Sequence, residues 1–204
     1  MRKTCAIICT GPSASKIDFA AIKVPKIGIN WSFLVTQSDI HVLTSRALIH
    51  KQGGNYVQLT PAAHTRISAL PLLGAYTPRW IATYDGGEEA AAISKDYNLY
   101  KDGWTFAGGS GCALQVAVSF GFDNIVFVGL DLLIVKNFHC FSDEKNSNDK
   151  CEKSGHTRKS AATAWLIQTS YLKLVRDGLK EQGIRVTNLG ISTVFPPGDF
   201  KEIS

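Results

Sequence analysis

The residues best suited to chemistry lie in a few short segments rich in glycine, serine and histidine. The first, Thr10-Gly11-Pro12-Ser13, directly follows a short apolar run. A glycine there lets the backbone pass close to a ligand, and hydroxyls with free helix N–H groups can bind phosphate or ribose oxygens. The same residues also suit an ordinary strand-to-helix turn with a serine N-cap, so both interpretations stay open.

A second segment, Gly108-Gly109-Ser110-Gly111, precedes an apolar stretch with helical spacing. Successive N–H groups of such a segment can form a nest for an anion. Ser110 is not expected to be a nucleophile, because Cys112 stands where the G-x-S-x-G elbow requires glycine. Close packing of a helix on a sheet is the alternative explanation for these glycines.

A third segment, residues 142–159, is a polar run of mixed charge that predicts a lid-like loop. Its downstream border contains His156, Arg158 and Lys159. A histidine titrates near neutral pH and can act as a general base, while the two cations could bind an anionic leaving group. A solvated surface loop is the alternative.

Histidine and cysteine also occur together in this part of the chain, at His139, Cys140, Cys151 and His156. These residue types suit zinc, but their spacing does not match the usual C-x₂₋₄-C or H-x₃₋₅-H patterns. We therefore expect no metal site.

The elements that must position these segments alternate along the chain. Apolar runs predict strands at residues 4–10, 26–30, 40–44, 56–60, 79–84, 124–130 and 184–188. Helical spacing predicts a short helix at 18–22 and longer helices at 111–120 and 160–181. The last of these carries Trp165, Leu172, Val175 and Leu179 on one apolar stripe.

This alternation indicates an α/β protein with a Rossmann-like, mostly parallel sheet and helices on both faces. Val- and Ile-rich strands without polar alternation are typical of a sheet covered on both sides, and the intervening helices imply parallel crossovers. We expect one domain over residues 1–204. Ligands of such sheets bind beyond the carboxyl ends of the strands, which places Asn30, Thr44 and Asp131 among the candidate binding residues.

Composition narrows the class of protein further. The chain has 204 residues, 45% of them hydrophobic and 19% charged, with a formal net charge of +5. A pI of about 8.9 suits an anionic ligand and falls short of a strongly basic nucleic-acid binder. No apolar run approaches the roughly 18 residues of a membrane span, and no secretion signal is evident. With five unpatterned cysteines, these features predict a cytoplasmic protein.

The order of these segments resembles that of the bacterial lipooligosaccharide sialyltransferases that use CMP-sialic acid. The best match runs from Gly109-Ser110-Gly111 to Gly129-Leu130-Asp131, and Gly155-His156-Thr157-Arg158 matches the catalytic histidine motif of that family. A broader similarity exists to the 6-hydroxymethylpterin pyrophosphokinase-like family, whose archaeal members transfer pyrophosphate from ATP.

The resemblance implies specific roles for individual residues. His156 would be the general base for the acceptor hydroxyl. The family places two tyrosines after G-x-D to stabilise the departing phosphate, and here Leu133 and His139 take their places. His139 and Arg158 are then expected to stabilise that phosphate. The residues implied to bind the donor are Thr10, Gly11, Pro12, Ser13, Asn30, Thr44, Ser110, Gly111 and Asp131.

The expected activity is an inverting, metal-independent glycosyl transfer from a nucleotide-sugar donor, which is a substrate, with no further cofactor. The acceptor would be a glycan or another compound with a hydroxyl group. The positive net charge of the chain is also compatible with modified DNA as the acceptor. The family also suggests a homo-oligomer. One alternative is a pyrophosphokinase that needs ATP and Mg²⁺, with Asp131 as the carboxylate near the phosphates. Another is a nucleotide-binding module without catalytic activity.

Overall fold

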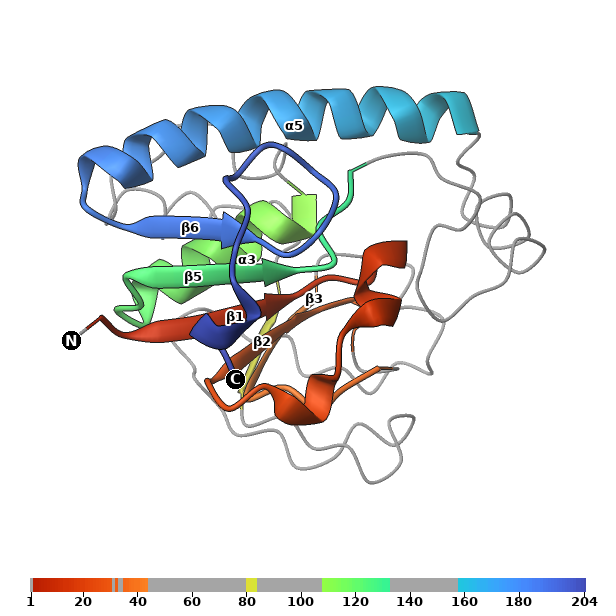
Figure 1. The fold of residues 1–204 in the computed structure, drawn as a ribbon. Coiled ribbons are helices and arrows are strands. Elements are labelled where there is room, and N and C mark those ends of the chain that lie inside the picture. The colour runs from red at the N-terminus through yellow and green to blue at the C-terminus, as the bar shows by residue number, and fades with distance from the viewer. Residues whose placement is uncertain (1, 31, 33–34, 44–79, 84–107, 133–157) are drawn as a thin grey trace.

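Six parallel strands form the sheet of this protein (Figure 1). The computed structural model describes residues 2–30, 32, 35–43, 80–83, 108–132 and 158–204. The strands are β1 (Thr4–Ile8), β2 (Lys26–Ile29), β3 (Ile40–Leu43), β4 (Trp80–Thr83), β5 (Asn124–Val128) and β6 (Arg185–Asn188). The predicted strand at 56–60 lies outside the described residues.

The order of the strands in the sheet is β4-β3-β2-β1-β5-β6. β1 therefore lies between β2 and β5, and Ile7 is paired with Ile27 on one side and with Phe127 on the other. From β1 the chain proceeds toward one edge through β2, β3 and β4, and β5 then returns to the opposite side of β1. Such a reversal of strand order leaves a crevice at the carboxyl ends of the two strands that flank it.

Two long helices cover one face of the sheet, namely α3 (Gly108–Ser119) and α5 (Arg158–Glu181). Alternate residues of the strands, such as Ile7 and Phe127, face these helices and are fully buried. From α5, Leu172, Val175 and Leu179 pack into the same core. This burial confirms the apolar stripe expected for the helix, with the exception of Trp165.

The opposite face is covered by short 3₁₀ helices: η1 (Pro12–Lys16), η2 (Phe19–Ala21) and η6 (Phe200–Glu202). Ile8 and Val128 of the central strands pack there against Ile22 and Ile203. Both faces are thus covered, and the α/β, Rossmann-like, single-domain prediction is confirmed. In the described part of the chain, however, both α-helices lie on the same face.

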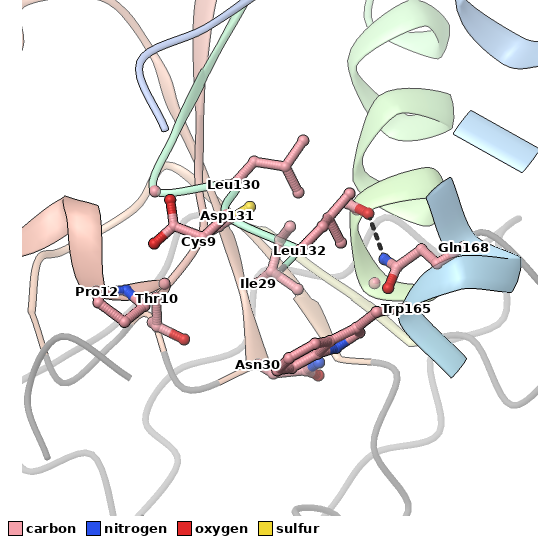
Figure 2. Close-up of a pocket in the computed structure, with 14 residues that line it drawn as sticks. Cys9, Thr10, Pro12, Ile29, Asn30, Leu130, Asp131, Leu132, Trp165 and Gln168 are labelled. Carbon is pink, nitrogen blue, oxygen red and sulfur yellow. Dashed lines mark hydrogen bonds between the residues drawn. The ribbon is translucent and has the colours of Figure 1, made fainter. Parts of the chain in front are cut away.

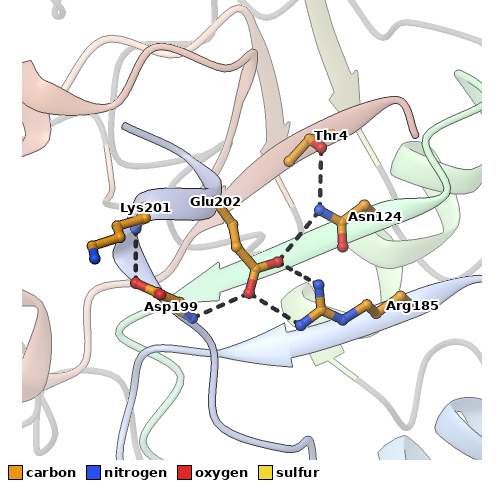
Figure 3. Close-up of polar contacts among 6 residues, drawn as sticks. All are labelled: Thr4, Asn124, Arg185, Asp199, Lys201 and Glu202. Atoms are coloured by element: carbon orange, nitrogen blue, oxygen red, sulfur yellow. Dashed lines mark hydrogen bonds and ion pairs between the residues drawn. The ribbon is translucent and has the colours of Figure 1, made fainter. Parts of the chain in front are cut away.

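The C-terminal segment is attached to the amino ends of the central strands by a polar network (Figure 3). Arg185 at the start of β6 donates to both carboxylate oxygens of Glu202, at 2.6 and 3.1 Å. Asn124 at the start of β5 donates to Thr4 and to Glu202. Glu202 also completes a capping box with Asp199. These contacts hold η6 on the sheet at the end remote from the carboxyl ends of the strands.

Both long helices begin two or three residues earlier than the sequence predicts. The helix expected at 111–120 begins at Gly108, so Ser110 and Gly111 lie within its first turn. The helix expected from residue 160 begins at Arg158, so the last two residues of the expected 142–159 loop are helical. The glycine-rich start of α3 and the basic start of α5, Arg158-Lys159, lack the apolar periodicity that marks a helix, which explains both differences.

Candidate functional site

A pocket of about 250 Å³ lies at the carboxyl ends of β1, β2 and β5 (Figure 2). This is the position where the strand order reverses. Its walls come from the loop after β1, the end of β2, the loop after β5, the first turn of α3 and the first half of α5. The lining residues are Cys9, Thr10, Gly11, Pro12, Ile29, Asn30, Gly109, Ser110, Gly129, Leu130, Asp131, Leu132, Trp165 and Gln168.

The loops after β1 and β5 pack backbone against backbone. The Gly11 N–H donates to the Gly129 carbonyl at 3.0 Å. A Cβ at Gly11 would lie 2.4 Å from that carbonyl oxygen, which leaves no room for a side chain. Gly129 has φ +72°, and a Cβ there would meet the Ala14 side chain at 2.7 Å. Glycine at both positions is therefore a requirement of the loop packing at this pocket.

Asp131 connects these loops to the C-terminal segment. Its Oδ2 accepts from the Ser13 N–H at 2.8 Å. Its Oδ1 accepts from the Ser13 hydroxyl at 2.5 Å and from the Ile191 N–H at 2.9 Å. Both oxygens of this buried carboxylate are thus bonded to the protein itself. The pyrophosphokinase alternative expects Asp131 to lie near the phosphates of ATP. In the structure its carboxylate instead holds Ser13 and Ile191 in place.

Ser110 and Gln168 join α3 to α5 at the pocket wall. The Gln168 amide donates to the Ser110 hydroxyl at 2.6 Å (Figure 2). Trp165 lies one turn before Gln168 on α5 and lines the same pocket with its half-buried indole. Trp165 was expected on the core stripe, but the helix extends past the core here and its first half borders the pocket instead.

Asn30 follows β2 with φ +45°, a left-handed conformation that non-glycine residues rarely adopt. Its carbonyl oxygen lies 2.8 Å from Nε2 of His41 on the neighbouring strand β3. Leu132, which also lines the pocket, has φ +50°. Left-handed backbone at residues other than glycine costs free energy and is concentrated at binding sites.

The thiol of Cys9, which also lines the pocket, is not a nucleophile. Burial, and secondarily the charge of Asp131, raise the pKa of this thiol well above its usual range. The thiol therefore stays protonated at neutral pH. Burial also raises the pKa of Cys5 and that of Cys112, the latter to about 12. All three are free thiols. Their apolar surroundings in the sequence predict that Cys5, Cys9 and Cys112 are small buried hydrophobic residues. This is confirmed for Cys5 and Cys112, whereas Cys9 is only partly buried and lines the pocket.

The structure brings together most of the described candidates. Thr10, Gly11, Pro12, Asn30, Ser110 and Asp131 line the pocket. Ser13 lies behind Asp131, to which it is hydrogen-bonded, and Gly111 lies next along α3. Arg158 is the first residue of α5. Thr44, His139 and His156 lie outside the described residues, so their catalytic or binding roles stay predictions.

Sequence reasoning missed Trp165, Gln168 and Leu132 as pocket residues. Trp165 and Gln168 are one helical turn apart on α5, but their spacing alone could not show that this turn passes the carboxyl edge of the sheet. Leu132 directly follows Gly129-Leu130-Asp131, so its position after a strand could have marked it as a candidate pocket residue. By contrast, a leucine gives no indication in the sequence that its backbone is left-handed.

Two further observations concern only the described part of the chain. No three His, Cys, Asp or Glu side chains there come together as a metal site would require. None of the helices described is both long and apolar enough to span a bilayer. The expectation of metal independence stays a prediction, because His139, Cys140, Cys151 and His156 are outside that part.

No protein-family model and no curated protein matches this chain. Solved structures do match it. The sialyltransferase CstII from Campylobacter jejuni, in complex with the substrate analogue CMP-3FNeuAc, has a TM-score of 0.55 at 14% identity, covering 98% of this chain and 87% of that one. The sialyltransferase CST-II with a trisaccharide acceptor and CMP has a TM-score of 0.56 at 13% identity, covering 97% and 86%.

A third structure, the monofunctional alpha-2,3-sialyltransferase Cst-I from Campylobacter jejuni, has a TM-score of 0.50 at 12% identity, covering 97% of this chain and 81% of that one. The similarity extends over nearly the whole chain, and at this identity it concerns the fold. The chain therefore has the α/β fold seen in these sialyltransferases, as the motifs predicted. Membership of that family stays a prediction.

Proposed function

We propose that this protein is a glycosyltransferase that binds a nucleotide-sugar donor, sialic-acid-like or other, in the pocket at the carboxyl ends of β1, β2 and β5. The observation that carries the proposal is the convergence of four chain segments on this pocket: the Gly11 turn, Asn30, the first turn of α3 and the Gly129–Asp131 loop. The first turn of α3 presents backbone N–H groups suited to phosphate oxygens, whereas the N–H groups of Gly11 and Ser13 are bonded to Gly129 and Asp131 and shape the loop.

The fold supports the choice of reaction class. The matched structures include complexes with CMP and with a donor analogue, and one that also holds a trisaccharide acceptor. By analogy, we propose that this chain takes a nucleotide-linked sugar and a glycan hydroxyl, in a single domain whose lid-like loop ends before α5 begins at Arg158. The pocket has polar atoms from Asn30, Ser110 and Gln168 beside the apolar surfaces of Trp165 and Leu132. Such a mixture suits a sugar, which has both hydroxyls and C–H faces.

In the proposed mechanism His156 removes the proton of the acceptor hydroxyl. The acceptor oxygen then attacks the anomeric carbon from the face opposite the nucleotide, and the bond from that carbon to the phosphate oxygen breaks with inversion. The nucleotide departs with the bonding electron pair, and His139 and Arg158 stabilise the charge on its phosphate. This reaction requires no metal ion and no further cofactor.

Ligand-induced stabilisation tests the donor. CMP, CDP, UDP, GDP, ATP and their sugar conjugates are screened with and without Mg²⁺ by thermal shift. A nucleotide that binds only the folded protein must raise its Tm, and we expect a cytidine nucleotide to do so without Mg²⁺. Binding of ATP alone, with strict Mg²⁺ dependence, would instead favour the pyrophosphokinase.

The base is tested by substitution. His156→Ala should reduce transfer by about 10²–10⁴-fold, the usual contribution of general base catalysis, while leaving nucleotide binding unchanged. His64→Ala serves as the control, since the proposal gives His64 no part in the reaction. Full transfer activity in His156→Ala would show that the proposed base is wrong, and nucleotide binding without turnover of any donor would favour a non-catalytic module.

A further inference from the structure

His41 of β3 faces the side of the sheet opposite α3 and α5, because its neighbours Ile40 and Val42 pack on the α-helix side. It pairs in register with Gly28 of β2, two residues before Asn30. Only 1% of its surface is exposed. A Cβ at Gly28 would lie 2.2 Å from the Ser38 hydroxyl, 2.5 Å from the Ser32 hydroxyl and 2.8 Å from His41 Nδ1. Glycine at position 28 thus makes the space in which the imidazole and the two hydroxyls gather.

The hydrogen bond between His41 and Asn30 has a defined direction. Burial lowers the pKa of His41 to about 4, so the ring is neutral near pH 7. The Asn30 carbonyl can only accept a hydrogen bond, so Nε2, at 2.8 Å, must carry the proton and donate. In a neutral ring Nδ1 is then the acceptor, and it faces the cluster of serine hydroxyls.

Asn30 is a residue whose conformation needs support. Its φ of +45° is accessible to asparagine more readily than to most residues, yet it is still less favourable than an extended backbone. A buried donor aimed at the carbonyl of this residue favours the conformation in which that carbonyl points into the sheet. In that conformation Asn30 lines the pocket, as Trp165 does (Figure 2).

We infer that His41 is a positioning residue for this pocket: through the Asn30 carbonyl it holds Asn30 in the left-handed conformation that presents the Asn30 side chain to a ligand. The inference rests on the proposed function for the identity of that ligand, a nucleotide or nucleotide-sugar. His41 itself does not line the pocket and acts only through Asn30.

A double-mutant cycle separates positioning from general stability. His41→Gln keeps an N–H donor at a similar distance from the backbone, whereas His41→Leu removes the donor. If the leucine variant does not fold, His41→Asn replaces it, because its shorter side chain cannot reach the Asn30 carbonyl. Each is made alone and with Asn30→Gly, which removes the side chain and readily accepts a positive φ. Affinity for CMP is measured by calorimetry, and Val42→Ala, facing the other side of the sheet, is the control for lost stability.

We expect His41→Leu to weaken CMP binding by about five- to tenfold, the equivalent of one hydrogen bond, and His41→Gln to restore most of it. In the Asn30→Gly background neither substitution should change the affinity further, and Val42→Ala should lower the Tm with the affinity intact. The same loss with and without the Asn30 side chain, or no loss at all in His41→Leu, would overturn the inference.

A ligand-independent readout distinguishes this failure from failure of the proposed function. The backbone ¹³C chemical shifts of Asn30 report its φ, and they should move toward extended values in His41→Leu but not in His41→Gln. If the wild-type protein does not bind CMP and these shifts still move, the proposed donor is wrong while His41 retains its effect on Asn30. Unchanged shifts would refute the positioning role itself.

Discussion

At the scale of single residues, Asp131 and Gly11 determine how closely the loops after β1 and β5 approach each other. Asp131 accepts three hydrogen bonds from two separate segments, and Gly11 permits contact between the two backbones. Neither residue needs to touch a ligand in order to shape the pocket. Substitutions at both should therefore lower stability as well as binding.

Asp131→Asn leaves one carbonyl oxygen and one NH₂ where two carboxylate oxygens now accept hydrogen bonds. At least one N–H, from Ser13 or Ile191, then loses its acceptor. We expect the free energy of unfolding to fall by about 1–3 kcal/mol, as for a buried group left unsatisfied, measured by urea denaturation. Ser13→Ala, which removes only the hydroxyl bond, should cost about 1 kcal/mol. Equal stability of Asp131→Asn and wild type would contradict the organising role of the carboxylate.

Gly11→Ala introduces a methyl group 2.4 Å from the Gly129 carbonyl oxygen. Because backbone rather than a flexible side chain stands in the way, the loops must move apart. We expect a loss of ~1–3 kcal/mol of stability, typical of overpacking, and weaker nucleotide binding. Gly183→Asn is the matched control, because a Cβ at Gly183 has no neighbour within 4 Å and asparagine tolerates the positive φ. A Gly11→Ala protein as stable as that control would be incompatible with this packing.

At the scale of elements, β6 and η6 depend on one another through Glu202. Glu202→Gln removes the charge that pairs with Arg185 and weakens the capping box. Since Glu202 is only 18% exposed while Arg185 is 47% exposed, we expect a cost of about 1 kcal/mol. Backbone amides of η6 should exchange faster with solvent, while those of β1 should not.

The exposed ion pair between Arg176 and Asp177 is the control for that experiment. Asp177→Asn should leave the denaturation midpoint unchanged, because exposed pairs contribute little. If the two substitutions had the same effect, the network in Figure 3 would have no special part in attaching the C-terminal segment.

At the scale of the whole molecule, buried His41 makes stability depend on pH. Its pKa is lowered from 6.5 to about 4 by burial, so the unfolded chain binds a proton before the folded chain does. The stability present above pH 6.5 therefore decreases as the pH falls toward 4, by on the order of 3 kcal/mol at roughly 1.36 kcal/mol per pKa unit. His41→Gln should show a shallower decrease over this range. Identical pH profiles in urea denaturation would disprove the assignment, since all other titrating groups are shared.

Much of the architecture could be predicted from the amino-acid pattern. Within the described residues, the expected strands form within one or two residues of their predicted ends, and 160–181 is helical with Leu172, Val175 and Leu179 of its apolar stripe in the core. These features depend on local periodicity and on the need to bury apolar surface, which any window of the sequence shows. For the same reason the carboxyl-edge segments could be recognised as candidates before their neighbours in space were known.

The composition of the pocket depended on contacts between residues far apart in the chain. Which turn of α5 borders the crevice, and hence that Trp165 and Gln168 line it, follows from how a helix that begins at Arg158 lies across the sheet. Likewise, Asp131 accepts hydrogen bonds from Ser13 and Ile191, and His41 donates to Asn30, because tertiary packing brings each donor close to its acceptor. A residue's type limits the bonds it can form, but only the folded chain selects its partner.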